Sequence, residues 1–203
     1  MRSVHRTIIV AAIAAAAASC GDVVRQGRGP VLLVVNALQG ARGSQPGTFG
    51  IPLLSDVITN VITPAPCSAT TPCPTVFNDL GQAVFQVTMK DVSVSPSANN
   101  QVTITRYHVQ FIRSDGHNVE GVDVPYAFDG AATVTIAAGA TGTMPFELVS
   151  VSAKQEAPLV QLKTNPVEIS TLAQVTFYGQ DVVGNAIQAT ASLSINFANF
   201  GDQ

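Results

Sequence analysis

The chain has 203 residues, of which 46% are apolar and 11% are charged, with 10 basic and 13 acidic side chains. A chain this apolar can bury a core, which excludes an intrinsically disordered protein. The acidic balance argues against a nucleic-acid-binding protein, because such proteins neutralise phosphates with basic side chains. One domain is the expected number at this length. The 12 prolines and 16 glycines indicate many short elements joined by turns.

The chain begins with a segment that is typical of an export signal. Arg2 and Arg6 give it a positive charge, and residues 8–18 form an apolar run too short to span about 30 Å of hydrocarbon. The run ends in Ala17-Ala18-Ser19-Cys20-Gly21, which resembles the signal of bacterial lipoproteins, although that family usually has leucine at the position of Ala17. The other interpretation is plain secretory cleavage just before Cys20.

The lipoprotein resemblance implies that residues 1–19 are removed and that Cys20 is acylated on its sulfur and on its new amino group. Such an anchor is stable, since each buried methylene contributes about 0.8 kcal/mol. In lipoproteins of bacteria with two membranes, aspartate directly after the cysteine favours the inner membrane. Gly21 occupies that position here, so the resemblance implies a lipid-anchored protein of the outer membrane.

Removal of residues 1–19 leaves 8 basic and 13 acidic side chains, a formal charge near −5. Residues 20–30 contain three glycines and a proline, and we expect them to form a lipidated tether that reaches about 30 Å at most. Residues 31–203 are expected to form a single β-domain.

The first predicted strand is the apolar run Val31–Val35, which is short and rich in β-branched residues and is expected to be buried on both faces. Residues 40–80 are expected to add further strands or loops. They contain Cys67 and Cys73, which prolines flank and which we expect to form a disulfide outside the cytoplasm. Zinc would need two more nearby ligands, and a redox dithiol would have Cys-x-x-Cys spacing.

Apolar side chains alternate with mostly polar ones from residue 82 onward, which is the period of a half-buried strand. The alternating sets are Ala83/Phe85/Val87/Met89, Val134/Ile136, Met144/Phe146/Leu148, Ala173/Val175/Phe177 and Ile187/Ala189/Ala191/Leu193/Ile195/Phe197. Turn-forming pairs such as Asp-Gly and Asn-Pro separate these sets. The pattern predicts an all-β protein built as an antiparallel β-sandwich.

Two stretches resemble immunoglobulin-like domains. In residues 104–111 the alternation slips by one between Ile104 and Tyr107, and the strand then runs into Ser114-Asp115-Gly116. This resembles the third strand and following hairpin of fibronectin type III and related domains. Residues 175–186 are similar to their last hairpin, which turns through Asp-x-x-Gly-Asn. The resemblance implies an immunoglobulin-like sandwich with extra N-terminal strands or loops, although the tryptophan of the second strand is absent.

The sequence lacks the motifs of the common catalytic classes: Gly-x-Ser-x-Gly, His-Glu-x-x-His, a Gly-rich phosphate loop and Cys-x-x-Cys-His. His108 alternates with apolar neighbours and is expected to face solvent. His117 is expected to lie at a hairpin tip. We therefore predict that the protein is not an enzyme and that it carries no cofactor apart from the covalent lipid.

Four residues with oxygen-bearing side chains follow the strand predicted at residues 104–111. They are Asp115, Asn118, Glu120 and Asp123. Oxygen ligands spaced through a loop are what calcium needs. The other interpretation is ordinary hairpin chemistry, with Glu120 and Asp123 pointing outward from a strand that contains Val122 and Val124. Because the spacing does not match an EF-hand loop, we expect no metal site here.

Tyr126 and Phe128 follow a proline in a predicted connection. If they are exposed, they would form a contact patch for a protein or a glycan, because aromatic residues are enriched at such contacts. The other interpretation is that both fill the core, since the chain has only three tyrosines, nine phenylalanines and no tryptophan.

Together these features predict a non-catalytic lipoprotein of the bacterial cell envelope whose immunoglobulin-like domain has a structural or protein-binding role. Its expected partners are the lipid bilayer, through acylated Cys20, and an envelope protein or glycan, with no nucleic acid. Two alternatives remain open. A carbohydrate-active or other hydrolytic enzyme would need two convergent carboxylates. A subunit of a surface assembly would pair with another chain through Val31–Val35.

Overall fold

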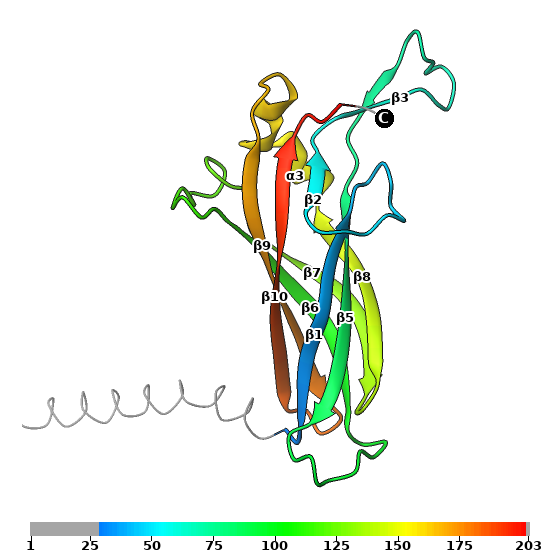
Figure 1. Cartoon of the computed structure of the whole chain (residues 1–203), viewed down its shortest axis with the longest axis vertical. Coiled ribbons are helices and arrows are strands. Elements are labelled where there is room, and N and C mark those ends of the chain that lie inside the picture. Colours follow the sequence, from blue (N-terminus) through cyan, green and yellow to red (C-terminus); the bar gives the residue numbers. More distant parts are fainter. Residues whose placement is uncertain (1–28, 202–203) are drawn as a thin grey trace, which may run out of the picture.

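The computed structural model describes residues 29–201, so the predicted signal, Cys20 and most of the tether lie outside the described residues. Within them the chain forms ten strands and two short helices (Figure 1). The strands are β1 (Val31–Ala41), β2 (Leu53–Asp56), β3 (Thr59–Val61), β4 (Cys73–Thr75), β5 (Asp79–Met89), β6 (Gln101–Ile112), β7 (Phe128–Ala137), β8 (Thr141–Val149), β9 (Ile169–Asp181) and β10 (Ala186–Ala198). The helices are α3 (Val151–Gln155) and the 3-10 helix η1 (Leu159–Lys163).

The strands form two main sheets and one small separate sheet. One main sheet has the order β1-β5-β8, and the other has the order β2-β10-β9-β6-β7. The separate sheet pairs β3 with β4. Neighbouring strands are antiparallel except for β2, which runs parallel to β10. The all-β prediction is therefore confirmed, and the extra strands expected within residues 40–80 are β2, β3 and β4.

The core lies between the two main sheets, where inward-facing side chains of β5 and β8 meet those of β6 and β9. The Phe85 ring of β5 meets the Phe177 ring of β9 edge to face, with centroids 4.8 Å apart. Phe146 of β8 lies 5.5 Å from Phe177 and 4.9 Å from Tyr107 of β6. Rings at these separations attract one another beyond the gain from burial. This aromatic cluster joins the two sheets.

The predicted slip in the alternation of residues 104–107 is a β-bulge in β6. Ile104 pairs with Gly179 of β9 and Arg106 pairs with Tyr178, so Thr105 has no place in the register. Thr105 and Arg106 are both exposed, whereas Ile104 and Tyr107 are buried. An inserted residue shifts the phase of a period-two strand in this way.

The hairpin that joins β9 to β10 has the predicted Asp-x-x-Gly-Asn turn. The Asp181 carboxylate accepts hydrogen bonds from the backbone N–H groups of Val183 and Asn185, at 3.1 and 2.8 Å. Gly184 has a φ of 84°, a backbone conformation that favours glycine. These contacts fix the turn, and residues 187–197 alternate with their apolar side chains facing inward.

The prediction that Val31–Val35 is buried on both faces is wrong. Val31 and Leu33 are buried, but Leu32 is 49% exposed and Val34 is 37% exposed. The strand lies at the edge of its three-stranded sheet, with one face toward the core and the other toward solvent. An unbroken apolar run hides this alternation, because both faces carry the same type of residue.

The two helices were not predicted from the sequence. Each has five residues, which is little more than one turn, so neither gives a detectable helical period. They lie in the connection between β8 and β9. In the described part of the chain, no helix combines the length and the apolar character that crossing a bilayer requires.

The connections at the two ends of the sheets differ in length. The chain enters β1 at one end, which we call the base and which also holds the turns at residues 90–100, 138–140 and 182–185 (Figure 1). The opposite end, which we call the loop end, holds the connections at residues 42–78, 113–127 and 150–168 (Figure 1). β1 alone, with 11 residues, spans about 35 Å between the two ends.

Candidate functional site

The loop end carries three of the features that the sequence singled out. These are the two cysteines, the polar residues that follow β6, and the pair Tyr126 and Phe128. It also carries a buried ion pair that the sequence did not predict. The predicted lipidation site Cys20 lies outside the described residues.

Cys67 and Cys73 form a disulfide, as predicted, within an arm that extends beyond the main sheets (Figure 1). The arm is the hairpin of β3 and β4, which pair with each other in three positions and with no other strand in the part of the chain that is described. Two-stranded sheets are marginally stable alone. By the chain-entropy model a cross-link that closes so short a loop contributes about 2 kcal/mol, which helps to hold the arm in shape.

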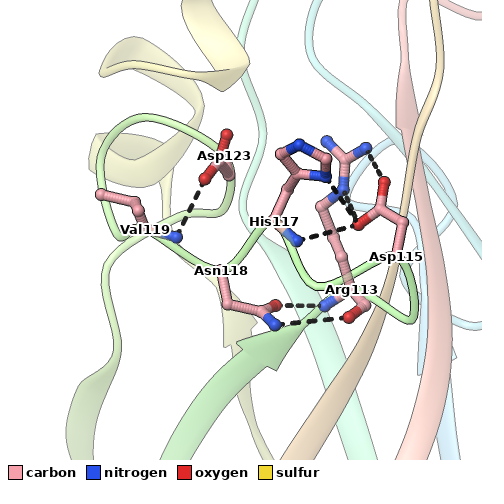
Figure 2. A network of polar contacts seen from close by, with 6 residues as sticks. All are labelled: Arg113, Asp115, His117, Asn118, Val119 and Asp123. Atoms are coloured by element: carbon pink, nitrogen blue, oxygen red, sulfur yellow. Dashed lines mark hydrogen bonds and ion pairs between the residues drawn. The ribbon is translucent and has the colours of Figure 1, made fainter.

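Polar contacts organise the connection that follows β6, as Figure 2 shows. Arg113 binds Asp115 in a two-point contact, with Nη2 to Oδ2 at 2.5 Å and Nε to Oδ1 at 3.2 Å. The same carboxylate accepts the backbone N–H of His117 at 3.1 Å. The Asn118 side chain accepts the backbone N–H of Arg113 at 2.6 Å, and Asp123 accepts that of Val119 at 3.0 Å.

The strand expected to contain Val122 and Val124 is absent, and a compact turn takes its place. The N–H groups of Val122 and Asp123 donate to the carbonyl of Val119, and Glu120 forms only an isolated bridge with Val124. Because no strand alternation orients this segment, Val122 is 67% exposed. The expected strand is therefore wrong, although Glu120 is exposed and Asp123 is only half-buried.

The four candidate calcium ligands do not converge in this loop. Asp115 binds Arg113, Asn118 binds the backbone of Arg113, Asp123 binds the N–H of Val119, and Glu120 accepts the N–H of Ala127 at 3.3 Å. Among residues 29–201, no three His, Cys, Asp or Glu side chains are grouped so that they could hold a metal ion. The contacts of these side chains shape the loop itself.

Arg113 lowers the pKa of the Asp115 carboxyl from its ordinary 3.8 to about 2, with a smaller contribution from the His117 N–H. A depressed pKa means that this contact stabilises the folded loop above pH 4 and is lost as the pH falls through about 2. We expect Arg113→Ala to return the Asp115 midpoint toward 3.8, as measured by NMR titration of the carboxyl carbon. Arg25→Ala, in the predicted tether, serves as the control for removing an arginine elsewhere.

Tyr126 and Phe128 have different environments. Phe128 packs against the core and lies edge to face with Tyr107, with ring centroids 6.3 Å apart. Tyr126 is 56% exposed. It lines a cavity of about 110 Å³ between the 113–127 connection and α3, together with Pro125, Phe128, Ser150, Ala153 and Glu156. Only Tyr126 of the pair is therefore available to a partner.

Three wider hollows lie elsewhere on the surface. One lies by the 42–52 connection beside Arg42 and Phe49, a second by Ser114 and Leu172, and a third by Lys163 and Asn199. None of these four cavities has two carboxylate side chains in its lining. The geometry expected for the hydrolytic alternative is thus not found in them.

A buried ion pair lies beneath the loop end. Lys154 of α3 and Asp79 of β5 are each 1% exposed, and Nζ lies 2.8 Å from Oδ2. Asp79 also accepts the hydroxyl of Ser55 on Oδ2 at 2.5 Å and the N–H of Gly43 on Oδ1 at 3.0 Å. Lys154 donates to the backbone carbonyl of Asp56 at 2.8 Å. The cluster therefore joins α3 to β2, to β5 and to the 42–52 connection.

Burial lowers the pKa of Lys154 because the charged ammonium loses its hydration, and the Asp79 carboxylate opposes this shift. No sequence pattern indicates this ion pair. The two residues are 75 positions apart, and neither belongs to a recognisable motif. Only the packing of α3 over the ends of β2 and β5 brings them together.

The two histidines of the predicted mature chain lie on the surface. His108 faces the outer side of β6, with Nδ1 3.4 Å from Oδ1 of Asp129. His117 has a side chain that is 69% exposed, and its Nδ1 lies 3.5 Å from Oδ1 of Asp115. Neither lines the four cavities described above.

Comparison with protein-family models, with curated proteins and with solved structures found no match to this chain. The structure by itself shows an all-β fold.

Proposed function

We propose that the protein is a lipid-anchored, non-catalytic component of the bacterial cell envelope that binds another envelope protein through its loop end. The single observation that carries this proposal is the placement of the long connections opposite the base. A chain anchored at Cys20 would present the base toward the membrane and the loop end away from it. The proposed tether of residues 20–30 leaves that end free to meet a partner.

The surface of the loop end supports a binding role. Val119, Val122 and Tyr126 are 60%, 67% and 56% exposed on one connection, beside the cavity that Tyr126 lines. Ile62, on the arm, is 54% exposed. Among these residues Tyr126 is the strongest candidate for a contact, because tyrosine is enriched among the residues that dominate contacts between proteins.

The immunoglobulin-like part of the proposal is supported by strand order. When the extra strands β2 to β4 are set aside, seven strands remain in the main sheets. The first, second and fifth of them form one sheet, and the other has the order seventh, sixth, third, fourth. This order matches sheets A-B-E and G-F-C-C′ of immunoglobulin-like domains, since strand C′ joins the G-F-C sheet in variable-type domains. Such folds host many functions, so the strand order by itself does not indicate binding.

The test of the binding role uses two matched pairs of substitutions. Tyr126→Ala and Val122→Ala change exposed residues of the loop end, whereas Tyr178→Ala and Val183→Ala change the same residue types away from it. The partner is first captured by crosslinking in the native envelope. We expect Tyr126→Ala to weaken binding of the partner by at least about 10-fold, as for an anchor residue. The control substitutions, Tyr178→Ala for Tyr126→Ala and Val183→Ala for Val122→Ala, should leave that binding unchanged. Equal affinities for all four variants would contradict the proposal.

The test of the anchor is independent of the partner. Cys20→Ala is expected to abolish incorporation of a labelled fatty acid and to release the protein from the membrane fraction. Cys67→Ala, which removes a cysteine of the arm, serves as the control and should keep the label. Continued labelling of Cys20→Ala would contradict the lipoprotein assignment without bearing on the loop end.

A further inference from the structure

We propose that Lys154 and Asp79 condense to an intramolecular amide, which joins Nζ of the lysine to Cγ of the aspartate. The amine and the carboxyl group are already in contact, at 2.8 Å, and both side chains are 99% buried. The two groups come from elements far apart in sequence, so the bond would link β5 covalently to α3. This inference does not depend on the lipid anchor or on the binding role.

Burial favours the neutral forms that the reaction needs. An ammonium cannot attack a carboxylate, but transfer of one proton from Nζ to Asp79 gives an amine facing a carboxylic acid. Burial lowers the pKa of Lys154, because the ammonium loses its hydration, and although the Asp79 carboxylate opposes this shift, the net direction favours release of the proton from Nζ. Because the two reacting groups are held in contact, the reaction is intramolecular. Well-oriented intramolecular groups react as if one were present at an effective concentration of about 10⁵ M or more.

The groups around Asp79 match the needs of each step. Nζ attacks Cγ, and the negative charge that develops on Oδ1 is stabilised by the N–H of Gly43 at 3.0 Å. Oδ2 then leaves as water, taking up a proton that the attacking nitrogen releases. The Ser55 hydroxyl donates a hydrogen bond to this leaving oxygen, with Oγ 2.5 Å from Oδ2. One C–N bond forms and one C–O bond breaks, with no change in oxidation state.

The product would keep its hydrogen-bond partners. The remaining N–H of the amide can donate to the carbonyl of Asp56, which accepts from Nζ at 2.8 Å. The amide carbonyl can accept the N–H of Gly43. A neutral amide with both groups satisfied avoids the desolvation penalty of a buried ion pair, which favours condensation.

Peptide mapping of the purified full chain tests the proposal. We expect digestion to yield a branched peptide that contains both residues and that is lighter than the two separate peptides by one water molecule. In the denatured protein, Lys154 should resist a reagent that methylates amines, whereas the exposed Lys90 serves as the reactive control. Asp79→Asn should give the same branched peptide with loss of ammonia, and Asp79→Ala should give none.

Recovery of the two peptides in separate, unmodified form, with Lys154 fully methylated after unfolding, would overturn the proposal and leave the pair as a buried ion pair. Both measurements use the native sequence, so the result does not depend on whether a variant folds. Ser55→Ala, which removes the hydrogen bond to the leaving oxygen Oδ2, is expected to slow formation of the branched peptide at least 10-fold.

Discussion

Lys154→Met is expected to lower the free energy of unfolding by at least about 3 kcal/mol, because it leaves the Asp79 carboxylate buried without a partner cation, and loss of an amide would add to this. Asp79 is 1% exposed and would keep only the hydroxyl of Ser55 and the N–H of Gly43 as partners. Urea unfolding followed by circular dichroism measures the loss. A loss below about 1 kcal/mol would show that solvent reaches the site.

The double variant Lys154→Met/Asp79→Leu distinguishes an ion pair from an amide. Replacing both members of a buried ion pair with apolar residues of similar size is often neutral or stabilising, so an ion pair predicts recovery of most of the loss. An amide would instead cross-link two residues 75 positions apart, whose removal costs about 4 kcal/mol by the chain-entropy model. The double variant would then remain destabilised. The free energy of unfolding of the double variant therefore tests the proposed amide independently of mass measurement.

The parts of the fold that could be predicted are those that local rules determine. The slip at residues 104–107 is visible in the sequence because a strand has a strict period of two, and the structure explains it by a bulge at Thr105. The β9–β10 hairpin followed from its turn chemistry, in which Asp181 caps the turn and Gly184 supplies a positive φ. Both features depend on residues close together in the chain.

The parts that could not be predicted depend on which elements meet. Leu32 and Val34 are exposed because β1 is an edge strand, and an apolar run carries no information about its neighbours. The contact between Lys154 and Asp79 exists only because α3 crosses the ends of β2 and β5. In the loop after β6, Asp115 and Asp123 bind local donors, and a list of ligand types does not reveal such contacts.

Phe177→Ala is expected to lower the free energy of unfolding by about 3–5 kcal/mol, since it removes a fully buried ring and leaves a cavity. The effect should be at the high end of this range, because the ring contacts both Phe85 and Phe146 of the opposite sheet. Its neighbours are fixed in strands and cannot easily collapse into the space. Urea unfolding of the wild-type chain and the variant gives the difference.

Phe128→Ala is the matched control for this substitution. Phe128 is half-buried, and its ring contact is with Tyr107 at 6.3 Å, at the margin of the core. We therefore expect a loss well below that of Phe177→Ala, because less apolar area is removed from the interior and water can reach the site. Equal losses for the two variants would contradict a core centred between β5, β8 and β9. A larger loss for Phe177 would place the main stabilising contact between the two sheets rather than at the margin of the core.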